Sequence, residues 1–318
     1  MASVAALATI SLFIGVAELD AFVLLASRVP RTVALVLAGA SFAIIGLIMQ
    51  LLTRNRFVEP GTTGATDAAS LALLAVLMTA PGTPLWAKAA VASLGALLGV
   101  FGFLALVRRI PSRSSVLVPI VGILYGSVIA AVTTFIAYRT DMLQELLSWA
   151  VGDFSSVLRG RYEMLYFAAA AALIAWIAAD RFTVAGLGDD TARGLGLSAR
   201  GVLVLGATII AVVTGTMMVI VGVLPLLGLI APNIVSRLIG DNMRRAVPLV
   251  ALVGAVIVLL CDIVGRVARF PFEIPISVVM GVVGGVVFLW LLLSTARPVD
   301  APAGARRGRA VRRIAAGS

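Results

Sequence analysis

The segment "SRVPRTVALVLAGASFAIIGLIMQLLTRNRFVEPGTTG" (residues 27–64) decides the fold class of this chain. No charged residue occurs between Arg31 and Arg54. This interval is long enough to cross a bilayer, which takes about 20 mostly apolar residues in a helix. The segment therefore predicts a transmembrane helix over residues 31–53, with Pro30 at its start, where proline is well tolerated.

The rest of the chain repeats this pattern. Of its 318 residues 61% are apolar and 13% are charged, about half the charged share of soluble proteins (roughly 25%). We expect an all-α, polytopic membrane protein with about ten transmembrane helices. The expected spans are residues 4–24, 31–53, 67–80, 86–107, 115–137, 163–180, 201–222, 231–239, 246–267 and 275–294. Two of them, 67–80 and 231–239, are too short for a full crossing, and such helices survive only inside protein or along a cavity.

Several classes of function are excluded by what the sequence lacks. It has no histidine, which removes the usual zinc, haem and proton-shuttle chemistry. Its lone cysteine, Cys261, cannot form an intrachain disulfide. The one lysine, Lys88, is not part of a phosphate-binding P-loop, so the chain carries no ATPase site of that kind. Residues 1–20 lack the basic start and cleavage site of a signal peptide, which predicts an uncleaved first span.

Arginine sets the expected orientation. The net charge of +10 comes from loops and tail, and basic residues collect on the cytoplasmic side of membrane proteins. With the arginine-rich tail (297–318) and the N-terminus in the cytoplasm, 17 of the 25 basic residues face inward. The net charge therefore needs no nucleic-acid partner.

This orientation places Arg28, Arg31 and Arg266 on the outer side, against the inward trend. A guanidinium binds a carboxylate through two parallel hydrogen bonds, so outward arginines suit an acidic partner protein. Two other interpretations remain open. The arginines could reach to lipid headgroups, and Arg266 could pair with Asp262 one helical turn earlier.

Four ordered motifs resemble the FecCD-type permeases of ABC importers. Residues 27–64 resemble the RLPR…G…Q…TRN…P…G signature of that family. "GLGDDTARGLGLS" (186–198) resembles its LGE-x-x-A-x-x-LG segment, and residues 221–248 resemble its GL-x-x-PH-x-x-R segment. Residues 254–293 resemble its last two helices, and the match is collinear from about residue 27 to residue 294. The resemblance is strongest to the branch that imports iron–siderophore complexes, particularly catecholates.

The resemblance implies a cobalamin-importer-permease-like fold, with a permease domain over residues 1–296 and a basic cytoplasmic tail over 297–318. It implies a subunit without its own ATPase site in the cytoplasmic membrane, with both termini in the cytoplasm. The implied partners are ATP-binding subunits, a second permease subunit (a paralogue or an identical chain), an extracytoplasmic siderophore-binding lipoprotein and the ferric siderophore itself. No cofactor and no metal site are implied.

The resemblance also implies three sites. Arg28, Arg31 and Arg266 match arginines that contact glutamates on the substrate-binding protein. The segment 187–198 matches the cytoplasmic region that couples to the ATPase. Its candidate residues are Leu187, Gly188, Asp189, Asp190, Ala192, Leu195 and Gly196. The matching positions of a cytoplasmic gate are Asn55, Phe57, Ser114 and Ser115.

Three departures from the family pattern are taken as marks of a subfamily. Arg56 follows Asn55 where proline is usual, Asn233 replaces the usual histidine after Pro232, and Ser277 replaces a glycine. The alternatives are a cobalamin or haem importer of the same fold, or an ion-coupled secondary transporter. The last would need carboxylates at mid-membrane, and the expected spans offer almost none. We find no catalytic constellation that would indicate a membrane-embedded enzyme.

Overall fold

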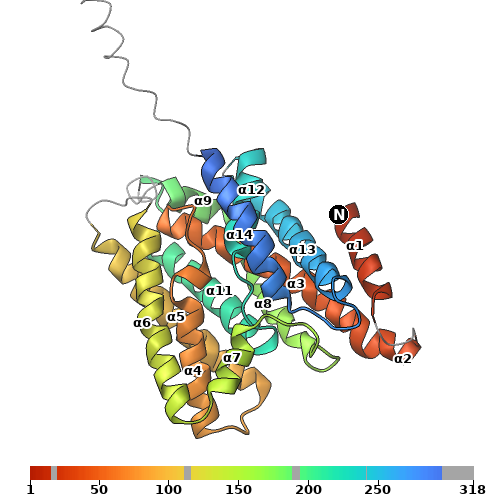
Figure 1. The fold of residues 1–318 in the computed structure, drawn as a ribbon. Coiled ribbons are helices and arrows are strands. Elements are labelled where there is room, and N and C mark those ends of the chain that lie inside the picture. The colour runs from red at the N-terminus through yellow and green to blue at the C-terminus, as the bar shows by residue number, and fades with distance from the viewer. Residues whose placement is uncertain (16–19, 111–115, 188–193, 241, 296–318) are drawn as a thin grey trace, which may run out of the picture.

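The computed structural model describes residues 1–15, 20–110, 116–187, 194–240 and 242–295 (Figure 1). Every regular element in these ranges is helical, as expected for an all-α protein. The α-helices are α1 (Ala2–Phe13), α2 (Ala21–Val23), α3 (Val29–Thr53), α4 (Ala65–Thr79), α5 (Leu85–Arg108), α6 (Leu117–Arg139), α7 (Leu143–Ala150), α8 (Leu165–Ile177), α9 (Ala179–Leu187), α11 (Ala199–Ile220), α12 (Leu227–Ile239), α13 (Met243–Val267) and α14 (Ile276–Thr295).

Each expected span after the first overlaps one of the described helices, or the α8–α9 pair. Five helical stretches are long and apolar enough to cross a membrane: α2 with α3, α5, α6, α11 and α13. The pair α8 and α9, which is bent by 63° at its break, would make a sixth if it crosses as one span. The shorter apolar helices are α1, α4, α12 and α14. At 15 and 13 residues, α4 and α12 confirm the two expected short helices, since about 20 residues are needed to cross.

The first expected span, 4–24, is wrong in its second half. α1 ends at Phe13 and the chain is extended at Ile14. A new helical stretch begins after Asp20, whose side chain accepts a hydrogen bond from the Ala21 N–H. An aspartate in this position caps a helix start. Glu18 and Asp20 stand between Phe13 and Ala21 in the sequence, and the expected span places them near its outer end.

Pro30 is the second residue of α3, as expected for a proline in the first turn, but another helical stretch precedes α3. A π-helical turn, Leu24–Arg28, leads directly into α3. Because proline lacks an N–H, the carbonyl of Ala26 four residues earlier loses its helical partner. The Arg159 N–H donates to this carbonyl at 3.1 Å. The start of α3 is thereby tied to the loop between α7 and α8.

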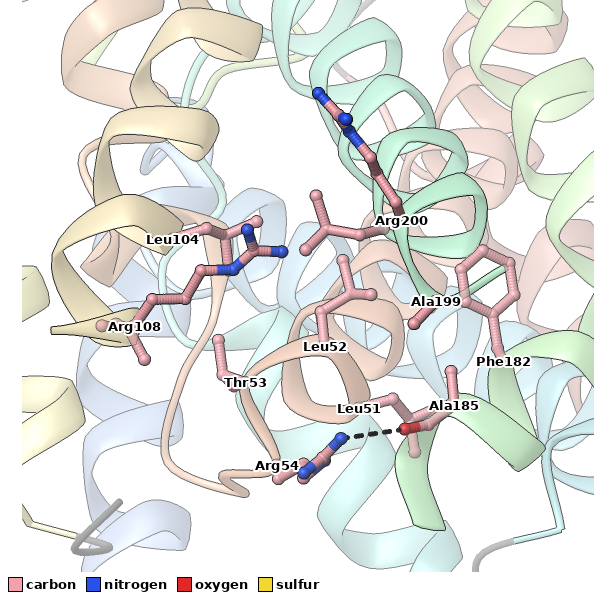
Figure 2. Close-up of a pocket in the computed structure, with 12 residues that line it drawn as sticks. Leu51, Leu52, Thr53, Arg54, Leu104, Arg108, Phe182, Ala185, Ala199 and Arg200 are labelled. Carbon is pink, nitrogen blue, oxygen red and sulfur yellow. Dashed lines mark hydrogen bonds between the residues drawn. The ribbon is translucent and has the colours of Figure 1, made fainter. Parts of the chain in front are cut away.

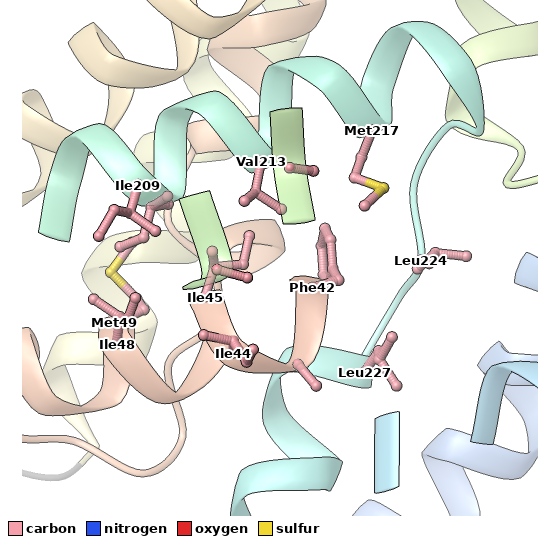
Figure 3. Close-up of a cluster of buried hydrophobic side chains, with 14 of the residues drawn as sticks. Phe42, Ile44, Ile45, Ile48, Met49, Ile209, Val213, Met217, Leu224 and Leu227 are labelled. Carbon is pink, nitrogen blue, oxygen red and sulfur yellow. The ribbon is translucent and has the colours of Figure 1, made fainter. Parts of the chain in front are cut away.

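α3 forms the centre of the bundle and contacts α8, α11, α12 and α13 (Figure 1). Its middle turns are buried and face the side chains of α11 (Figure 3). The residues drawn there include Phe42, Ile45, Ile48 and Met49 from α3 and Ile209, Val213 and Met217 from α11. A helix that is apolar all round is expected at such a position.

Paired glycines bring α3 into direct contact with two neighbours. A methyl group added at Gly46 would lie 2.0 Å from the Gly228 carbonyl oxygen of α12. One added at Gly39 would lie 2.7 Å from the Gly254 carbonyl oxygen of α13. Small residues permit this approach, and close packing is what associates helices in lipid.

The short helix α12 contains Pro232, which removes a helical hydrogen bond to the Gly228 carbonyl. The buried Gln50 side chain of α3 donates its Nε2 hydrogen to that carbonyl at 3.3 Å. Freed carbonyls inside membrane proteins need such a partner. Gln50 and Gly46 therefore hold α12 against the C-terminal half of α3.

The helices leave two ends that carry polar side chains. α9 and the C-terminal parts of α12 and α14 lie at one end, at the top of Figure 1. α2 and α7 lie at the opposite end. From here on the first is called the inner end and the second the outer end, after the expected arginine distribution.

Candidate functional site

At the outer end the structure brings Arg28, Arg31 and Arg266 together, although 235 positions separate Arg31 from Arg266 in the sequence. Arg31 and Arg266 meet at Asp262 of α13, Arg31 also reaches Glu273 of the following loop, and Arg28, like Arg266, binds the end of α1. These five residues are called the outer arginine cluster below.

Arg31 is held by both acids of the outer arginine cluster. Its Nη2 lies 2.7 Å from Oδ1 of Asp262, and its Nη1 lies 3.0 Å and 2.8 Å from the two carboxylate oxygens of Glu273. The Asp262 side chain is fully buried, the Arg31 side chain is 13% exposed and that of Glu273 is 34% exposed. Arg31 is thus the most accessible of the three predicted arginines.

Arg266 also pairs with Asp262, one helical turn away, which confirms the structural pairing considered from the sequence. Its guanidinium further donates to the carbonyls of Ser11 and Ile14 and to the Ser11 hydroxyl. Arg28 donates to the Leu12 carbonyl at 2.9 Å. Both side chains are buried and tie the end of α1 to α3 and α13, where carbonyls carry partial negative charge that favours a cation.

At the inner end, Asn55 and Phe57 lie in the turn between α3 and α4. The buried Asn55 side chain accepts a hydrogen bond from the Phe57 N–H at 2.9 Å. The Phe57 ring meets Phe288 of α14 edge to face, with ring centroids 6.2 Å apart. This contact joins the turn to the last described helix. The other two predicted gate residues, Ser114 and Ser115, lie outside the described residues.

Asn233, one of the departures from the family pattern, is tied to the same turn. Its Nδ2 donates to the Arg56 carbonyl at 2.9 Å and to the Leu229 carbonyl at 2.7 Å. An amide supplies two N–H donors without a titrating group. Asn233 therefore fixes the turn after α3 to α12 without adding a charge.

The predicted coupling segment is described in part. Leu187 is the last residue of α9, whereas Gly188, Asp189, Asp190 and Ala192 lie outside the described residues. Gly196 has a φ of 74°, which glycine adopts without strain, as the expected sharp turn requires. Leu195 beside it is 64% exposed, and Ser198 then caps α11 by accepting from the Gly201 N–H.

A pocket of about 440 Å³ lies next to this segment, between the inner ends of α3, α5, α9 and α11 (Figure 2). Leucine side chains and Phe182 form part of its wall. Arg54, Arg108 and Arg200 stand around it, and Arg54 reaches the Ala185 carbonyl at 3.5 Å. No acidic residue is among the described residues that line it. The inner end therefore presents a positively charged hollow beside an exposed leucine.

Sequence reasoning missed three acidic residues. Glu273 stands before the Ile274-Pro275 pair of a recognised motif, but its partner is 242 positions away, so no local spacing indicates the pair. Glu59 and Asp67 flank the start of α4, where they resemble ordinary loop and helix-start residues. The short expected span 67–80 could have indicated them, because a helix too short to cross the bilayer can begin inside it and place its first residues at that depth.

This arrangement, with short helices held inside a bundle of crossing helices, defines a multi-pass membrane transport permease. The fold matches an inward-facing metal-chelate-type ABC transporter with a TM-score of 0.78 at 22% identity, covering 92% of this chain and 96% of that one. The fold is therefore that of the cobalamin-importer permeases. Residues 2–294 match the FecCD transport family, and the chain belongs to this family.

Curated relatives align with nearly the whole chain. It is 43% identical over 299 residues to the petrobactin import system permease protein YclN of Bacillus subtilis, covering 90% of this chain and 94% of that protein. It is 38% identical over 274 residues to the ferric-anguibactin transport system permease protein FatD of Vibrio anguillarum, covering 86% and 87%. The vitamin B12 permease BtuC of Yersinia enterocolitica is 35% identical over 274 residues, covering 83% and 80%. Family membership implies ATP-binding subunits and a substrate-binding protein as partners.

Proposed function

We propose that this chain is the transmembrane permease subunit of an ABC importer that moves iron–siderophore complexes across the cytoplasmic membrane. The observation that carries the proposal is its 43% identity, over 90% of its length, to a permease named for a siderophore. The vitamin B12 permeases, at 35%, are less similar. Cobalamin is therefore the second candidate cargo.

Two permease subunits, identical or paralogous, would enclose the passage, and separate ATP-binding subunits would power it. The arginine distribution supports a cytoplasmic tail and N-terminus. On this orientation the outer arginine cluster faces a siderophore-binding lipoprotein. The positively charged hollow and Leu195 face the ATP-binding subunit, together with the predicted residues Gly188, Asp189, Asp190 and Ala192.

Docking of the binding protein would centre on Arg31. Its guanidinium is partly exposed and is already engaged with Glu273, which is itself partly exposed. A carboxylate of the binding protein would take over the position of Glu273, since both groups offer the same two oxygens. Arg28 and Arg266 would support this site indirectly. Both are buried and bound to carbonyls of α1, so they would hold the end of α1 in place.

The gate would be formed at the turn after α3. Phe57 is a bulky apolar side chain, and such a side chain can close a pore by excluding water. Its contact with Phe288 of α14 and the hydrogen bond that its N–H donates to the Asn55 side chain favour a fixed closed position. Ser114 and Ser115 would complete the gate from the start of α6.

Uptake of radioactive iron in a strain lacking this chain tests the proposal. Plasmid-borne wild type should restore ATP-dependent uptake of a ferric catecholate siderophore. Arg31→Glu should lower uptake by at least about tenfold, because it reverses the charge of the partly exposed arginine that the binding protein would contact. Arg139→Glu, at an exposed arginine of the same outer end, is the matched control and should retain uptake.

Other results would redirect the proposal. Restored uptake of cobalamin without uptake of any ferric siderophore would establish the second candidate. Uptake that continues in vesicles without ATP and follows an ion gradient would contradict an ABC importer. Equal uptake by Arg31→Glu and wild type, at equal protein levels, would remove the docking role of the outer arginine cluster.

A further inference from the structure

A cavity of about 510 Å³ lies between α4, α6, α7 and the loop that joins α11 to α12. Asp67 lines it from the first turn of α4, and Thr133 lines it from beyond the middle of α6. Pockets of this size hold small molecules or parts of larger ones. The cavity is separate from the outer arginine cluster and from the inner hollow, with which it shares no residue.

Two carboxylates line this cavity without a cation. The Asp67 carboxylate accepts from its own backbone N–H but makes no ion pair among the described residues. Glu59 is 3% exposed; its Oε1 accepts from the Leu226 N–H, while its Oε2 is buried without a hydrogen-bond partner in the described structure. No arginine or lysine is among the described lining residues. Uncompensated charge inside a membrane protein is costly and indicates a functional site.

The two carboxylates differ in how they are offset. The Glu59 side chain reaches the start of α12, where the partial positive charge of the helix N-terminus faces its carboxylate. Asp67 borders Gly126 of α6, where a methyl group would lie 2.7 Å from its Oδ2. That neighbour offers no side chain and no charge. Asp67 lies in the first turn of α4, whose N-terminus offsets part of its charge, but it is partly exposed, lines the cavity and has no ion-pair partner among the described residues. Asp67 is therefore the carboxylate that a ligand in the cavity can reach.

The remaining polar lining consists of hydroxyl groups that are set to accept hydrogen bonds. Thr133 donates its proton to the Ile129 carbonyl, and Ser70 donates to the Met218 sulfur. Their oxygens keep lone pairs for another donor. Carboxylate and hydroxyl oxygens around one hollow fit a cation that carries several N–H donors. The described hydroxyl-bearing lining residues are Thr62, Thr66, Ser70, Thr133 and Thr134.

We propose that this cavity receives an aliphatic ammonium group of the ferric chelate during its passage, with Asp67 as the residue that pairs with it. This inference rests on the proposed function as an importer of iron chelates. A ferric catecholate centre is itself anionic and would be repelled here. The cavity thus selects chelates with a cationic arm and orients that arm toward α4.

The test uses the complete importer, with its ATP-binding subunits and its substrate-binding protein, in proteoliposomes. Two ferric catecholate chelates of one scaffold are compared, one with a free ammonium arm and one with that arm acetylated. The ratio of their uptake rates is measured for each permease variant with the same binding protein. Any selectivity of the binding protein then cancels between variants.

Wild type should favour the ammonium chelate, and Asp67→Asn should lower this preference by about tenfold, as expected for loss of a partly buried charge pair. Asp67→Glu should keep most of it. Asp141→Asn removes the same charge at an exposed site outside the cavity and should leave the ratio unchanged. ATPase stimulation by the binding protein should be equal in all variants, which shows that each has folded and assembled.

An unchanged ratio in Asp67→Asn, or equal wild-type uptake of both chelates, would overturn this inference and leave the proposed function standing. A ratio that follows the sodium concentration would also overturn it, because the cavity would then hold a free metal cation. Failure of wild type to move either chelate would overturn the proposed function and this inference with it.

Discussion

The arginine side chains have different surroundings at the two ends of the molecule. At the outer end Arg31 and Arg266 pair with Asp262, Arg31 also pairs with Glu273, and the buried Arg28 and Arg266 bind carbonyl oxygens. At the inner end Arg108 and Arg200 are exposed beside a hollow whose described lining has no acid. Arg31 and Arg266 are ion-paired within the chain, whereas no ion pair of the described residues engages Arg108 or Arg200, which are exposed to a partner chain. The outer end is therefore stabilised by ion pairs within the chain, whereas the hollow at the inner end can bind another subunit.

The largest effect should come from Asp262→Asn. This change removes the carboxylate shared by Arg31 and Arg266 and leaves two buried cations with reduced compensation. Breaking a buried pair costs about 3–5 kcal/mol, so the free energy of unfolding should fall by roughly that amount. Thermal unfolding in detergent, followed by tryptophan fluorescence, measures it.

Asp180→Asn is the matched control for that prediction. Asp180 pairs with Arg244 at 2.5 Å, but both side chains are about two-thirds exposed, at 66% and 64%. Exposed pairs contribute about 0–1 kcal/mol, so this variant should unfold within a few degrees of wild type. Equal losses in the two variants would contradict the contrast between the ends.

The next effect concerns assembly at the inner end. Leu195→Asp places a charge on an exposed leucine beside the Gly196 turn. We expect the affinity for the ATP-binding subunit to fall by roughly 30-fold, about the cost of losing a central apolar contact (~2 kcal/mol). Co-purification and ATPase stimulation measure it. Leu195→Met keeps the apolar contact and should assemble normally; loss in both variants would mean that side-chain shape, not polarity, matters.

A smaller effect is expected at the gate. Phe57→Ala removes the edge-to-face contact with Phe288. Such a pair contributes about 0.5–1.5 kcal/mol, so passive leak of chelate through ATP-free proteoliposomes should rise by up to about tenfold. Phe57→Leu retains bulk and should leak less. A leak equal to that of wild type in Phe57→Ala would remove Phe57 from the gate.

The smallest effect should follow Glu273→Gln. It weakens the internal ligand of Arg31 while leaving Asp262 in place. The binding protein should then dock about threefold more tightly, as expected for a partly exposed ion pair, and the gain should shrink at high salt. Glu145→Gln, at an exposed acid of α7, controls for the general change of charge. Weaker docking would show that Glu273 supports Arg31 instead of competing with a partner.

Local spacing predicted part of this arrangement. The apolar runs located the helices, including the two short ones, and the four-residue spacing predicted the Asp262–Arg266 pair. The pairing of Arg31 with Glu273 joins segments 242 positions apart, which no local pattern records. The break after Phe13 was missed because hydropathy does not report backbone direction. Asp67 was missed because its importance depends on the lack of a nearby cation, which only packing reveals.

The contact of Gly46 with Gly228 has a consequence for motion. With no gap between the two backbones and Gln50 bonded across them, α12 cannot slide along α3 independently. α3 carries Arg31 near its first residue and is followed by Arg54 after its last. If the docked binding protein tilts α3 at the outer end, α12, Asn233 and the Phe57 turn should therefore move with it at the inner end. The glycine contact is what joins the two helices into one rigid unit.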